Sequence, residues 1–394
     1  MAERRVEPEQ QVMLVPRPLA PRKGRGAVSN LQGRYEVHGR ERFDDGWDSE
    51  APELDQDGKP VEAAPFKTQV TDEFAKTILS RNASPDVPFN VSLNPYRGCE
   101  HGCIYCFARP THSYLGLSPG LDFESRLYAK VNAPELLRQE LAKRNYVPEP
   151  IAIGVNTDAY QPCERARGLT RRVLEVLREC EHPLALITKS SLIERDIDLI
   201  AAMAAKRQAI AAITLTTLDP AIARTLEPRA ATPARRLRTI RTLADAGIPV
   251  GVSIAPIIPF VTEPELERLL EAAHAAGAVS AHYVVLRLPW EVNPLFQEWL
   301  EAHFPERAQR VMNRVRDMRG GKDYDSDFSK RMSGEGVWAE LIRQRFRTTV
   351  DRLGMGARTG RFETLDASRF RRPLYVPQPP AKQCGNATGQ LDLF

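Results

Sequence analysis

Three cysteines, Cys99, Cys103 and Cys106, stand within eight residues of one another in the spacing C-x3-C-x2-C. Gly98 and Gly102 stand beside them and give the backbone the freedom to turn all three side chains toward one point. Thiolates are soft ligands, which bind zinc, copper(I) and iron–sulfur clusters. The triplet therefore predicts a metal centre.

Four kinds of site could use this segment. A four-ligand zinc site needs a fourth donor, such as His101, His112 or Cys163. A redox dithiol needs only the last two cysteines of the triplet and leaves Cys99 without a role. Three buried cysteines that bind nothing would have no reason to share this spacing. We favour a 4Fe-4S cluster with three protein ligands, because it uses all three thiolates and leaves one iron open to an outside ligand.

Six short apolar segments predict β-strands, and stretches with a helical period of apolar residues lie between them. The predicted strands are residues 89–93, 151–155, 184–188, 209–215, 249–254 and 282–286. The predicted helices are residues 133–144, 170–180, 193–206, 233–246 and 263–276. This alternation favours parallel βα units, in a full or partial barrel or in a doubly wound sheet. In either architecture chemistry collects at the carboxyl ends of the strands, and the cysteine triplet follows the first strand.

The rest of the chain divides by composition. Residues 1–65 mix proline, glycine and charged residues without a period and are predicted to be an extended or disordered leader. The core barrel is expected over residues 66–290 and a mostly helical extension over residues 291–372. This extension is basic, because residues 301–372 hold 17 Lys or Arg against 11 Asp or Glu. Residues 373–394 are predicted to be a flexible tail.

Composition excludes several classes of protein. Of the 394 residues, 42% are hydrophobic and 27% charged, as in ordinary globular proteins. No segment approaches the roughly 20 apolar residues that span a bilayer, and the N-terminus lacks the apolar centre of a signal peptide. Six cysteines are too few for a disulfide scaffold. We expect a cytoplasmic protein with reduced thiols, and a net charge of +4 is too small to indicate a nucleic-acid partner by itself.

The cysteine triplet, with Tyr105 before its last cysteine and a sixfold βα repeat around it, resembles radical S-adenosylmethionine (SAM) enzymes. Neighbouring segments are similar to the branch of this superfamily that is related to spore photoproduct lyase. These segments are residues 94–99, 106–109, 157–162 and 187–190. The resemblance covers about residues 85–290 and implies a partial (β/α)6 barrel with a 4Fe-4S cluster and SAM as cofactors.

The resemblance also implies radical chemistry. The open iron would chelate the amino and carboxylate groups of SAM, and the reduced cluster would donate one electron to the sulfonium. The 5′-deoxyadenosyl radical that results would abstract hydrogen from a substrate. A one-electron donor such as flavodoxin or ferredoxin would be a partner, while the protein positions the cofactor and excludes water.

Polar residues that follow several predicted strands are implied contacts of SAM. Asn156, Thr157 and Asp158 end the second strand, where the family holds the amino group of SAM. Lys189 follows the third strand and would meet the SAM carboxylate as a point charge. The other implied contacts are Tyr105 for the cluster or adenine, Thr214, Thr216 and Thr217 for the ribose, and Ser253 and Val285 for the adenine. A polar residue at a strand end is also commonly a helix cap or turn residue, and that alternative stays open.

This chain differs from spore photoproduct lyase at the residue that donates hydrogen to the product radical. Spore photoproduct lyase uses a cysteine near the end of its second strand to return hydrogen to the product radical, and Val155 takes that place here. Cys163 lies a few residues further on and is the candidate catalytic cysteine. A lone cysteine is also commonly a small buried residue, as we expect for Cys180.

The last five residues resemble the peptide with which bacterial proteins bind the sliding clamp. They are Gln390, Leu391, Asp392, Leu393 and Phe394. In that pattern the glutamine makes polar contacts and the apolar side chains fill a pocket, at the end of a tether that raises their effective concentration. A tail that folds back on its own domain is the alternative.

Clamp binding would make DNA the expected substrate, because a sliding clamp collects enzymes that act on DNA. Candidate phosphate contacts are Arg229, Arg235, Arg236, Arg238 and Arg241 and the arginines within residues 307–372. Candidate stacking residues for a displaced base are Trp290, Tyr324, Phe328 and Trp338. Arginines along helices are also ordinary solvated residues, and aromatic residues are ordinary core residues.

The sequence thus predicts a radical SAM enzyme that acts on DNA in a repair reaction near the replication clamp. One alternative is a radical SAM enzyme that modifies RNA, protein or a small metabolite. Another alternative, from a different class, is a non-catalytic adaptor that a metal stabilises and that binds the clamp.

Overall fold

The structure is a computed structural model, which describes residues 21–36, 67–355 and 364–374. Most of the predicted leader and tail lies outside these residues, and so does the predicted clamp-binding peptide at residues 390–394.

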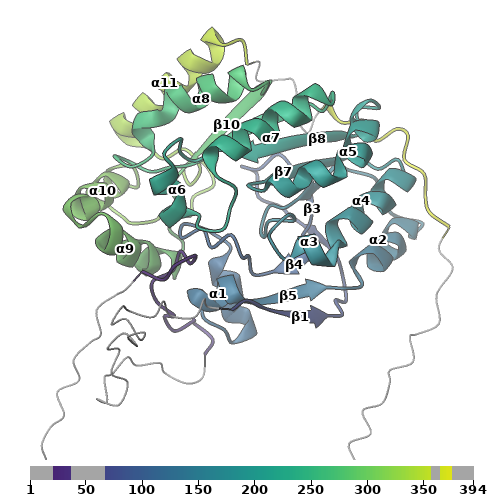
Figure 1. Ribbon diagram of the computed structural model, residues 1–394, viewed down its shortest axis with the longest axis horizontal. Helices are drawn as coiled ribbons and strands as arrows, with labels where there is room; N and C mark the ends of the chain where they lie inside the picture. The colour runs from purple at the N-terminus through teal and green to yellow at the C-terminus, as the bar shows by residue number, and fades with distance from the viewer. Residues whose placement is uncertain (1–20, 37–66, 356–363, 375–394) are drawn as a thin grey trace, which may run out of the picture.

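The main sheet has seven strands in the order β10-β9-β8-β7-β6-β3-β2 (Figure 1). Neighbours from β3 to β10 pair in parallel, while β2 (Leu79–Arg81) pairs antiparallel with β3 at the edge. The parallel strands are β3 (Val91–Leu93), β6 (Ile151–Ile153), β7 (Leu184–Thr188), β8 (Ala209–Thr214), β9 (Val250–Ile257) and β10 (Ser280–Val285). All six predicted strands are confirmed. Since β10 and β2 stand at opposite edges, the sheet is an open, partial (β/α)6 barrel.

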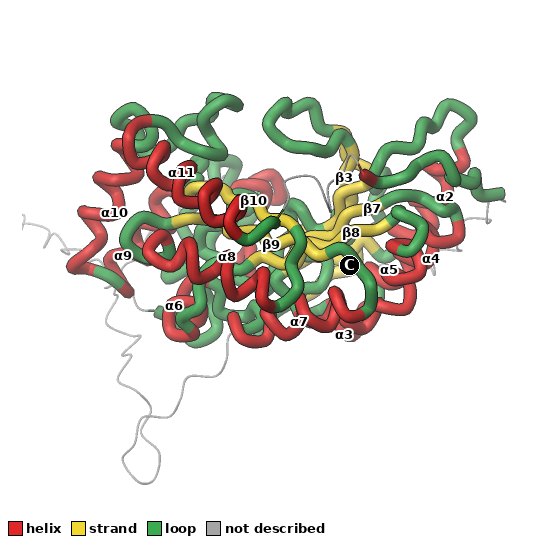
Figure 2. Tube along the Cα trace, turned by 90° about the horizontal axis from the view of Figure 1, so that it is seen from above, coloured by secondary structure: helices red, strands yellow, loops and turns green. Residues whose placement is uncertain are grey.

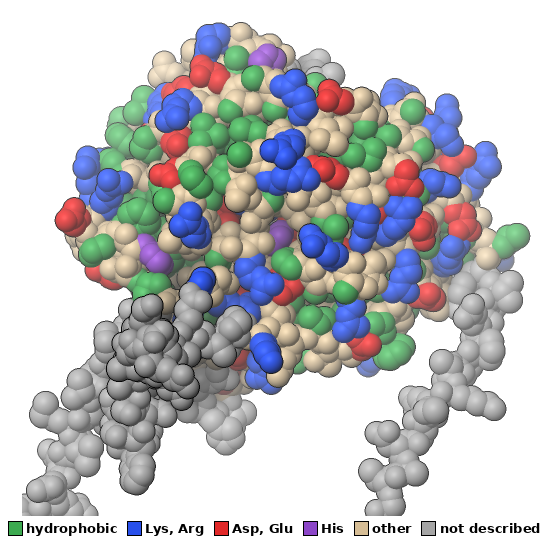
Figure 3. Space-filling model, viewed as in Figure 1, with side chains coloured by type: hydrophobic (Ala, Val, Ile, Leu, Met, Phe, Trp, Pro, Cys, Tyr) green, Lys and Arg blue, Asp and Glu red, His purple; other side chains and the backbone are tan. Residues whose placement is uncertain are grey.

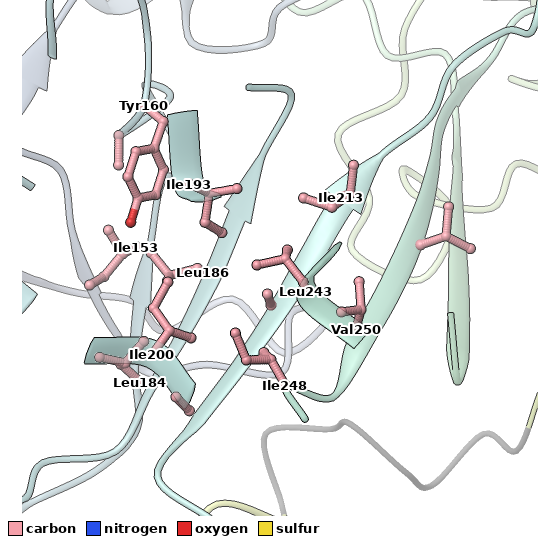
Figure 4. Packing of buried hydrophobic residues seen from close by; sticks show 14 of the residues in the cluster. Ile153, Tyr160, Leu184, Leu186, Ile193, Ile200, Ile213, Leu243, Ile248 and Val250 are labelled. Atoms are coloured by element: carbon pink, nitrogen blue, oxygen red, sulfur yellow. The ribbon is translucent and has the colours of Figure 1, made fainter. Parts of the chain in front are cut away.

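The crossover helices pack on one face of this sheet (Figure 2). They are α2 (Ala133–Ala142), α4 (Leu169–Glu179), α5 (Ile197–Ala204), α7 (Pro233–Asp245) and α8 (Leu266–Ala275), with the short α3 (Glu164–Arg167) and α6 (Pro220–Leu226). Figure 4 shows how Ile153, Leu186 and Ile213 from three neighbouring strands pack with Ile200 of α5 and Leu243 of α7 in one buried apolar core. Burial on both faces explains why the strands are continuous apolar runs.

A second sheet, which the sequence did not predict, lies beside the cysteines. Its order is β1-β5-β4, with β1 (Gln69–Glu73) parallel and β4 (Tyr96–Arg97) antiparallel to β5 (Arg126–Lys130). These strands are short and partly exposed, so they carry no apolar run that could be recognised. β4 ends two residues before Cys99 and therefore fixes where the cysteine segment begins.

Residues 21–36 of the predicted extended or disordered leader contain no helix or strand and pack against the rest of the protein. Ala27 and Val28 are buried, and the backbone N–H groups of Gly26 and Ala27 donate hydrogen bonds to the carboxylate of Glu124 at 3.0 and 2.9 Å. Ala27 joins an apolar group that includes Ile104 of the cysteine segment. The segment is held by backbone groups and by polar side chains such as Arg25, Asn30 and Arg34, which leave no hydrophobic period in the sequence.

Three helices follow the barrel: α9 (Val292–His303), α10 (Pro305–Asp317) and α11 (Gly336–Arg352). α9 packs against α10, and α11 packs against α8 of the barrel. Residues 364–374 run past the amino ends of the strands, where the N–H of Arg371 donates to the carbonyl of Cys180 at 2.8 Å. No helix in the described part of the chain is long and apolar enough to cross a membrane.

Candidate active site

The three cysteines lie in one loop, residues 98–106, which we call the cluster loop. Cys99 and Cys103 are buried and Cys106 is partly buried, and none of the described cysteines forms a disulfide. Burial raises the pKa of the Cys103 thiol to about 12, with Lys189 acting in the opposite direction and Cys106 adding to the rise. Burial, Asp158 and the two other cysteines raise the pKa of Cys99 well above its usual range. A bound cation is needed to hold these buried thiols as thiolates at neutral pH.

The donor set fits an iron–sulfur cluster better than a single zinc ion. Among the described residues, no three His, Cys, Asp or Glu side chains converge as ligands of one metal ion. His101 Nδ1 lies 3.2 Å from a carboxylate oxygen of Asp158, and His112 Nε2 lies 2.9 Å from the carbonyl oxygen of Arg126. Both histidines thus have protein partners, and the described residues offer the zinc alternative no fourth ligand. A 4Fe-4S cluster needs only three cysteines set around it, each on a different iron.

Arg109 holds the backbone of the cluster loop. Its guanidinium is fully buried and donates to the carbonyls of Gly102 at 3.0 Å and Cys103 at 2.9 Å. The same group pairs with Glu124, which also accepts the N–H groups of the leader residues Gly26 and Ala27. One buried ion pair therefore joins the cluster loop to the N-terminal segment, and breaking such a pair costs about 3–5 kcal/mol.

Two buried amides join the cluster loop to the carboxyl end of β6. Gln161 accepts the N–H of Glu100 at 2.8 Å and donates to the carbonyl of Gly98 at 3.2 Å, so it grips the backbone on both sides of Cys99. Asn94, directly after β3, accepts the N–H of Asn156 at 3.1 Å. The loops after β3 and β6 therefore hold a single relative position.

Asp158 connects the cluster loop to β7. Its carboxylate accepts hydrogen bonds from the hydroxyl of Thr188 at 2.7 Å and from the N–H of Lys189 at 2.8 Å, and His101 faces it. Burial alone would raise the pKa of Asp158, but His101 and these hydrogen bonds outweigh burial and hold the pKa well below its usual range. Asp158 is thus a buried carboxylate at neutral pH. Its contact with SAM stays a prediction.

The side chains of the neighbouring candidates Asn156, Thr157 and Lys189 differ in whether they are available to a ligand. The side chain of Asn156 is exposed at the carboxyl end of β6, whereas Thr157 is buried and donates to the carbonyl of Tyr96 at 3.0 Å. Burial lowers the pKa of Lys189, but nearby Cys103, together with Glu227 and Asp158, outweighs burial and raises it. Lys189 is therefore a cation beside the cysteines, and its predicted partner, the carboxylate of SAM, requires this positive charge.

Tyr105 belongs to a buried network at the carboxyl end of β8. Its hydroxyl donates to Glu227, which also accepts the hydroxyl of Thr216 at 2.7 Å and pairs with Arg236. The side chains of Glu227 and Arg236 are 0% and 2% exposed. The hydroxyl of Thr216 is thus engaged within the protein.

Two further threonines have backbone or capping contacts. The carbonyl of Thr214 accepts a hydrogen bond from Arg236 at 3.1 Å. The hydroxyl of Thr217 donates to Glu265 and accepts the N–H of Asp219 at 3.0 Å. These contacts match the alternative that polar residues at strand ends shape turns.

Ser253 and Val285 lie within strands β9 and β10. Both are buried, and Ser253 stands opposite Thr214 in the pairing of β8 with β9. The N–H of Val285 donates to the carbonyl of Met332 at 2.9 Å. Their proximity to adenine stays a prediction.

Cys163 does not lie in the cluster loop. It directly precedes α3 and is partly buried against Tyr96 and Leu169. Burial, with Glu100 and Glu164, raises the pKa of its thiol to about 12, so the thiol keeps its proton at neutral pH. A thiol that donates a hydrogen atom must be protonated, and Cys163 meets this requirement.

Residues 93–273, from the last residue of β3 nearly to the end of α8, match the family model of the radical SAM superfamily. These residues form a radical SAM domain. The superfamily implies a 4Fe-4S cluster and SAM, for which the cluster loop provides three cysteines.

Relatives of this radical SAM domain include uncharacterised proteins. One from Mycobacterium tuberculosis is 37% identical over 226 residues, which are 57% of this chain and 66% of that protein. The chain thus matches just under two thirds of that relative's length. Another, from Methanocaldococcus jannaschii, is 25% identical over 226 residues, 57% of this chain and 80% of that protein.

A mutant of spore photoproduct lyase is similar in structure. It superposes with a TM-score of 0.50 over 73% of this chain and 80% of its own, at 15% sequence identity. At this identity the likeness is one of fold.

Sequence reasoning found the cysteines of the radical SAM domain but missed the residues that hold them. Arg109, Glu124 and Glu227 are buried charged residues, and periodicity cannot tell a buried ion pair from a surface one. Arg236, a candidate phosphate contact from the sequence, is instead buried and paired with Glu227. Gln161 lies within a segment that carried the resemblance, but nothing in the sequence assigned a role to its amide.

Proposed function

We propose that the protein is a radical SAM enzyme that acts on DNA in a repair reaction close to the replication clamp. The observation that carries the first part is the cluster loop: three free cysteines at the carboxyl edge of a radical SAM domain, with no competing single-metal site among the described residues. When bound there, a 4Fe-4S cluster would supply the electron for reductive cleavage of SAM.

The chain's own residues supply position and charge. Cys99, Cys103 and Cys106 would hold the iron, while Arg109 and Gln161 fix the backbone that carries them. The buried setting keeps water from the reactive centre. Lys189 and Asn156 stand at the same strand ends and would meet the carboxylate and amino groups of SAM, and Cys163 stays the candidate hydrogen donor.

DNA as the substrate rests on different support. The peptide Gln390–Phe394 resembles a clamp-binding signal, and clamps collect enzymes that act on DNA. The fold likeness is to a lyase whose name gives a photoproduct as its substrate. The charge of the surface adds little, because Lys and Arg are spread over the face in Figure 3 with Asp and Glu between them.

The test of the radical SAM activity is oxygen-free purification and reconstitution with iron, sulfide and dithionite. We expect about four irons per chain and release of 5′-deoxyadenosine from SAM. The Cys103→Ser variant should lose both the iron and the release of 5′-deoxyadenosine. Cys180 is a buried cysteine at the end of α4, and the Cys180→Ser variant should keep both. A protein that carries stoichiometric zinc and refuses iron would overturn the proposal.

The substrate is tested on the same reconstituted protein. Ultraviolet-damaged DNA is the substrate, and undamaged DNA and RNA are the controls. We expect repaired nucleotides from the damaged DNA alone. A product from RNA, with none from damaged DNA, would contradict the DNA proposal and leave the SAM chemistry standing.

A further inference from the structure

Arg287 lies two residues beyond β10, at the edge of the sheet that carries the cluster loop. Its guanidinium carbon is 5.4 Å from the ring centroid of Phe107, which directly follows Cys106 in the chain. The Phe107 ring is 43% exposed. Arg287 is therefore a cation beside the last cysteine of the cluster loop, at a surface that solvent reaches.

Within residues 21–36, 67–355 and 364–374, no carboxylate contacts Arg287. Its guanidinium nitrogens donate only to neutral groups, to the sulfur of Met332 at 3.5 Å and to the hydroxyl of Tyr324 at 3.5 Å, the second at the limit of a hydrogen bond. Its Nε is buried and has no hydrogen-bond partner among the described residues. A guanidinium that is buried in part and left unpaired is costly unless a ligand completes it.

Two cations near Arg287 are paired with carboxylates, whereas Arg287 and Arg319 each leave a buried Nε without a hydrogen-bond partner among the described residues. Arg331 forms a two-pronged pair with Asp86 at 2.5 and 2.6 Å, and Lys330 pairs with Glu335 at 2.7 Å. Asp86 is near enough for Arg287 to lower its pKa, but both of its oxygens are taken by Arg331.

Arg319 is a second cation near Arg287 that no carboxylate of the described residues contacts. It donates to the carbonyls of Leu286 and Lys330, both at 2.8 Å, and to no carboxylate in the described residues. Burial lowers the pKa of Arg319 to about 10, and repulsion by Arg287 contributes. An added anion would therefore relieve repulsion at this place.

A second exposed aromatic ring accompanies this charge. Phe328 is 46% exposed, and the guanidinium carbon of Arg331 lies 4.5 Å from its ring centroid. The two arginine–phenylalanine pairs are connected because Arg287 contacts the sulfur of Met332, which directly follows Arg331 in the sequence. An arginine that can bind phosphate, here Arg287, beside exposed rings is what an unpaired nucleic-acid strand requires, because the arginine contacts the phosphate and bases stack on the rings.

We propose that Arg287, Phe107 and Phe328 form a surface that holds an unpaired stretch of DNA beside the cluster loop. Arg287 binds a phosphodiester group, and the two rings stack bases on either side of it. This inference rests on the proposed function, since it takes DNA as the substrate, and it names where the strand would lie.

The test measures by fluorescence anisotropy how a fluorescein-labelled, single-stranded thymidine 12-mer binds to the iron-loaded protein without SAM. Arg287→Gln should weaken binding about tenfold, the loss expected for a charge-assisted hydrogen bond. The slope of log Kd against log salt should fall by about 0.7, the value for one phosphate contact in a single strand. Arg178→Gln, which removes the same charge in the last turn of α4, should bind within about twofold of the parent.

A second variant separates stacking from charge. Phe107→Leu keeps an apolar side chain but removes the ring, so affinity should fall about fivefold or more while the salt slope stays unchanged. The inference is overturned if Arg287→Gln binds with the parent affinity and slope, or if Phe107→Leu binds as the parent does.

The outcome is independent of the proposed function's own test. Binding is measured without SAM, so a strand held by Arg287 on a protein that releases no 5′-deoxyadenosine would contradict the radical activity alone. Repair of damaged DNA by an Arg287→Gln variant with parent affinity would contradict this surface alone.

Discussion

The carboxylate of Glu227 accepts hydrogen bonds from three side chains around the cluster loop. Tyr105, Thr216 and Arg236 all converge on it, and the ion pair with Arg236 is buried. A tyrosine held by a buried carboxylate cannot swing away from the cysteines beside it. Glu227 is thus a positioning residue for Tyr105.

Glu227→Gln should destabilise the protein strongly. The amide keeps the size of the side chain but leaves Arg236 as a buried cation without a counter-charge, which costs about 3–5 kcal/mol. We expect a clearly lower melting temperature for the iron-loaded variant, measured by circular dichroism. Glu175→Gln is the control, because the Glu175 side chain is 50% exposed on α4. Equal melting temperatures for the two variants would show that the buried pair does not stabilise the site.

At the scale of elements, the sequence predicted the strands whose burial requires apolar residues. Five of the parallel strands are almost wholly buried and mostly apolar, and β10 is apolar only in part, yet all six were predicted. β7 was predicted with its observed bounds, Leu184–Thr188. The sheet β1-β5-β4 and the packed segment 21–36 were missed, because backbone hydrogen bonds and half-exposed strands hold them. In the site, thiol spacing is local and could be predicted. The contacts of Arg109 with Glu124 arise only from tertiary packing.

The segment 21–36 gives the prediction that belongs to this scale. A Cβ on Gly26 would lie 1.9 Å from the carbonyl oxygen of Gly102, so the leader backbone approaches the cluster loop too closely for any side chain. Gly26→Ala must therefore push the leader away from the loop. Because the leader covers the loop through Glu124, we expect the iron–sulfur absorbance to bleach severalfold faster in air.

Gly24→Ala is the matched control for that experiment. Gly24 lies in the same segment at φ +74°, with no atom within 4 Å of an added Cβ, so the substitution adds only backbone strain of about 1–2 kcal/mol. Its cluster should bleach at nearly the parent rate. Equal rates for Gly26→Ala and the parent would mean that the leader does not protect the loop.

At the scale of the whole molecule, the two ends of the barrel are separate. The cluster loop, Lys189 and Arg287 all follow strands, at the carboxyl end of the sheet. The C-terminal segment 364–374 lies at the amino end, where Phe370 packs against Tyr146 and His182 (Figure 1). The last described residue, Leu374, therefore stands at the end of the barrel away from the cysteines.

This separation predicts that clamp binding and catalysis are independent. Deleting residues 390–394 should weaken binding to a bacterial sliding clamp about 100-fold or more, because buried apolar anchors carry most of such an interface. SAM cleavage and the binding of the thymidine 12-mer should not change, since the deletion lies 16 residues or more beyond Leu374. Surface plasmon resonance on immobilised clamp measures the first quantity, and the assays above measure the others. Unchanged clamp affinity would remove the support that the C-terminal peptide gives to the DNA proposal, whereas lost SAM cleavage would show that the tail acts at the active site.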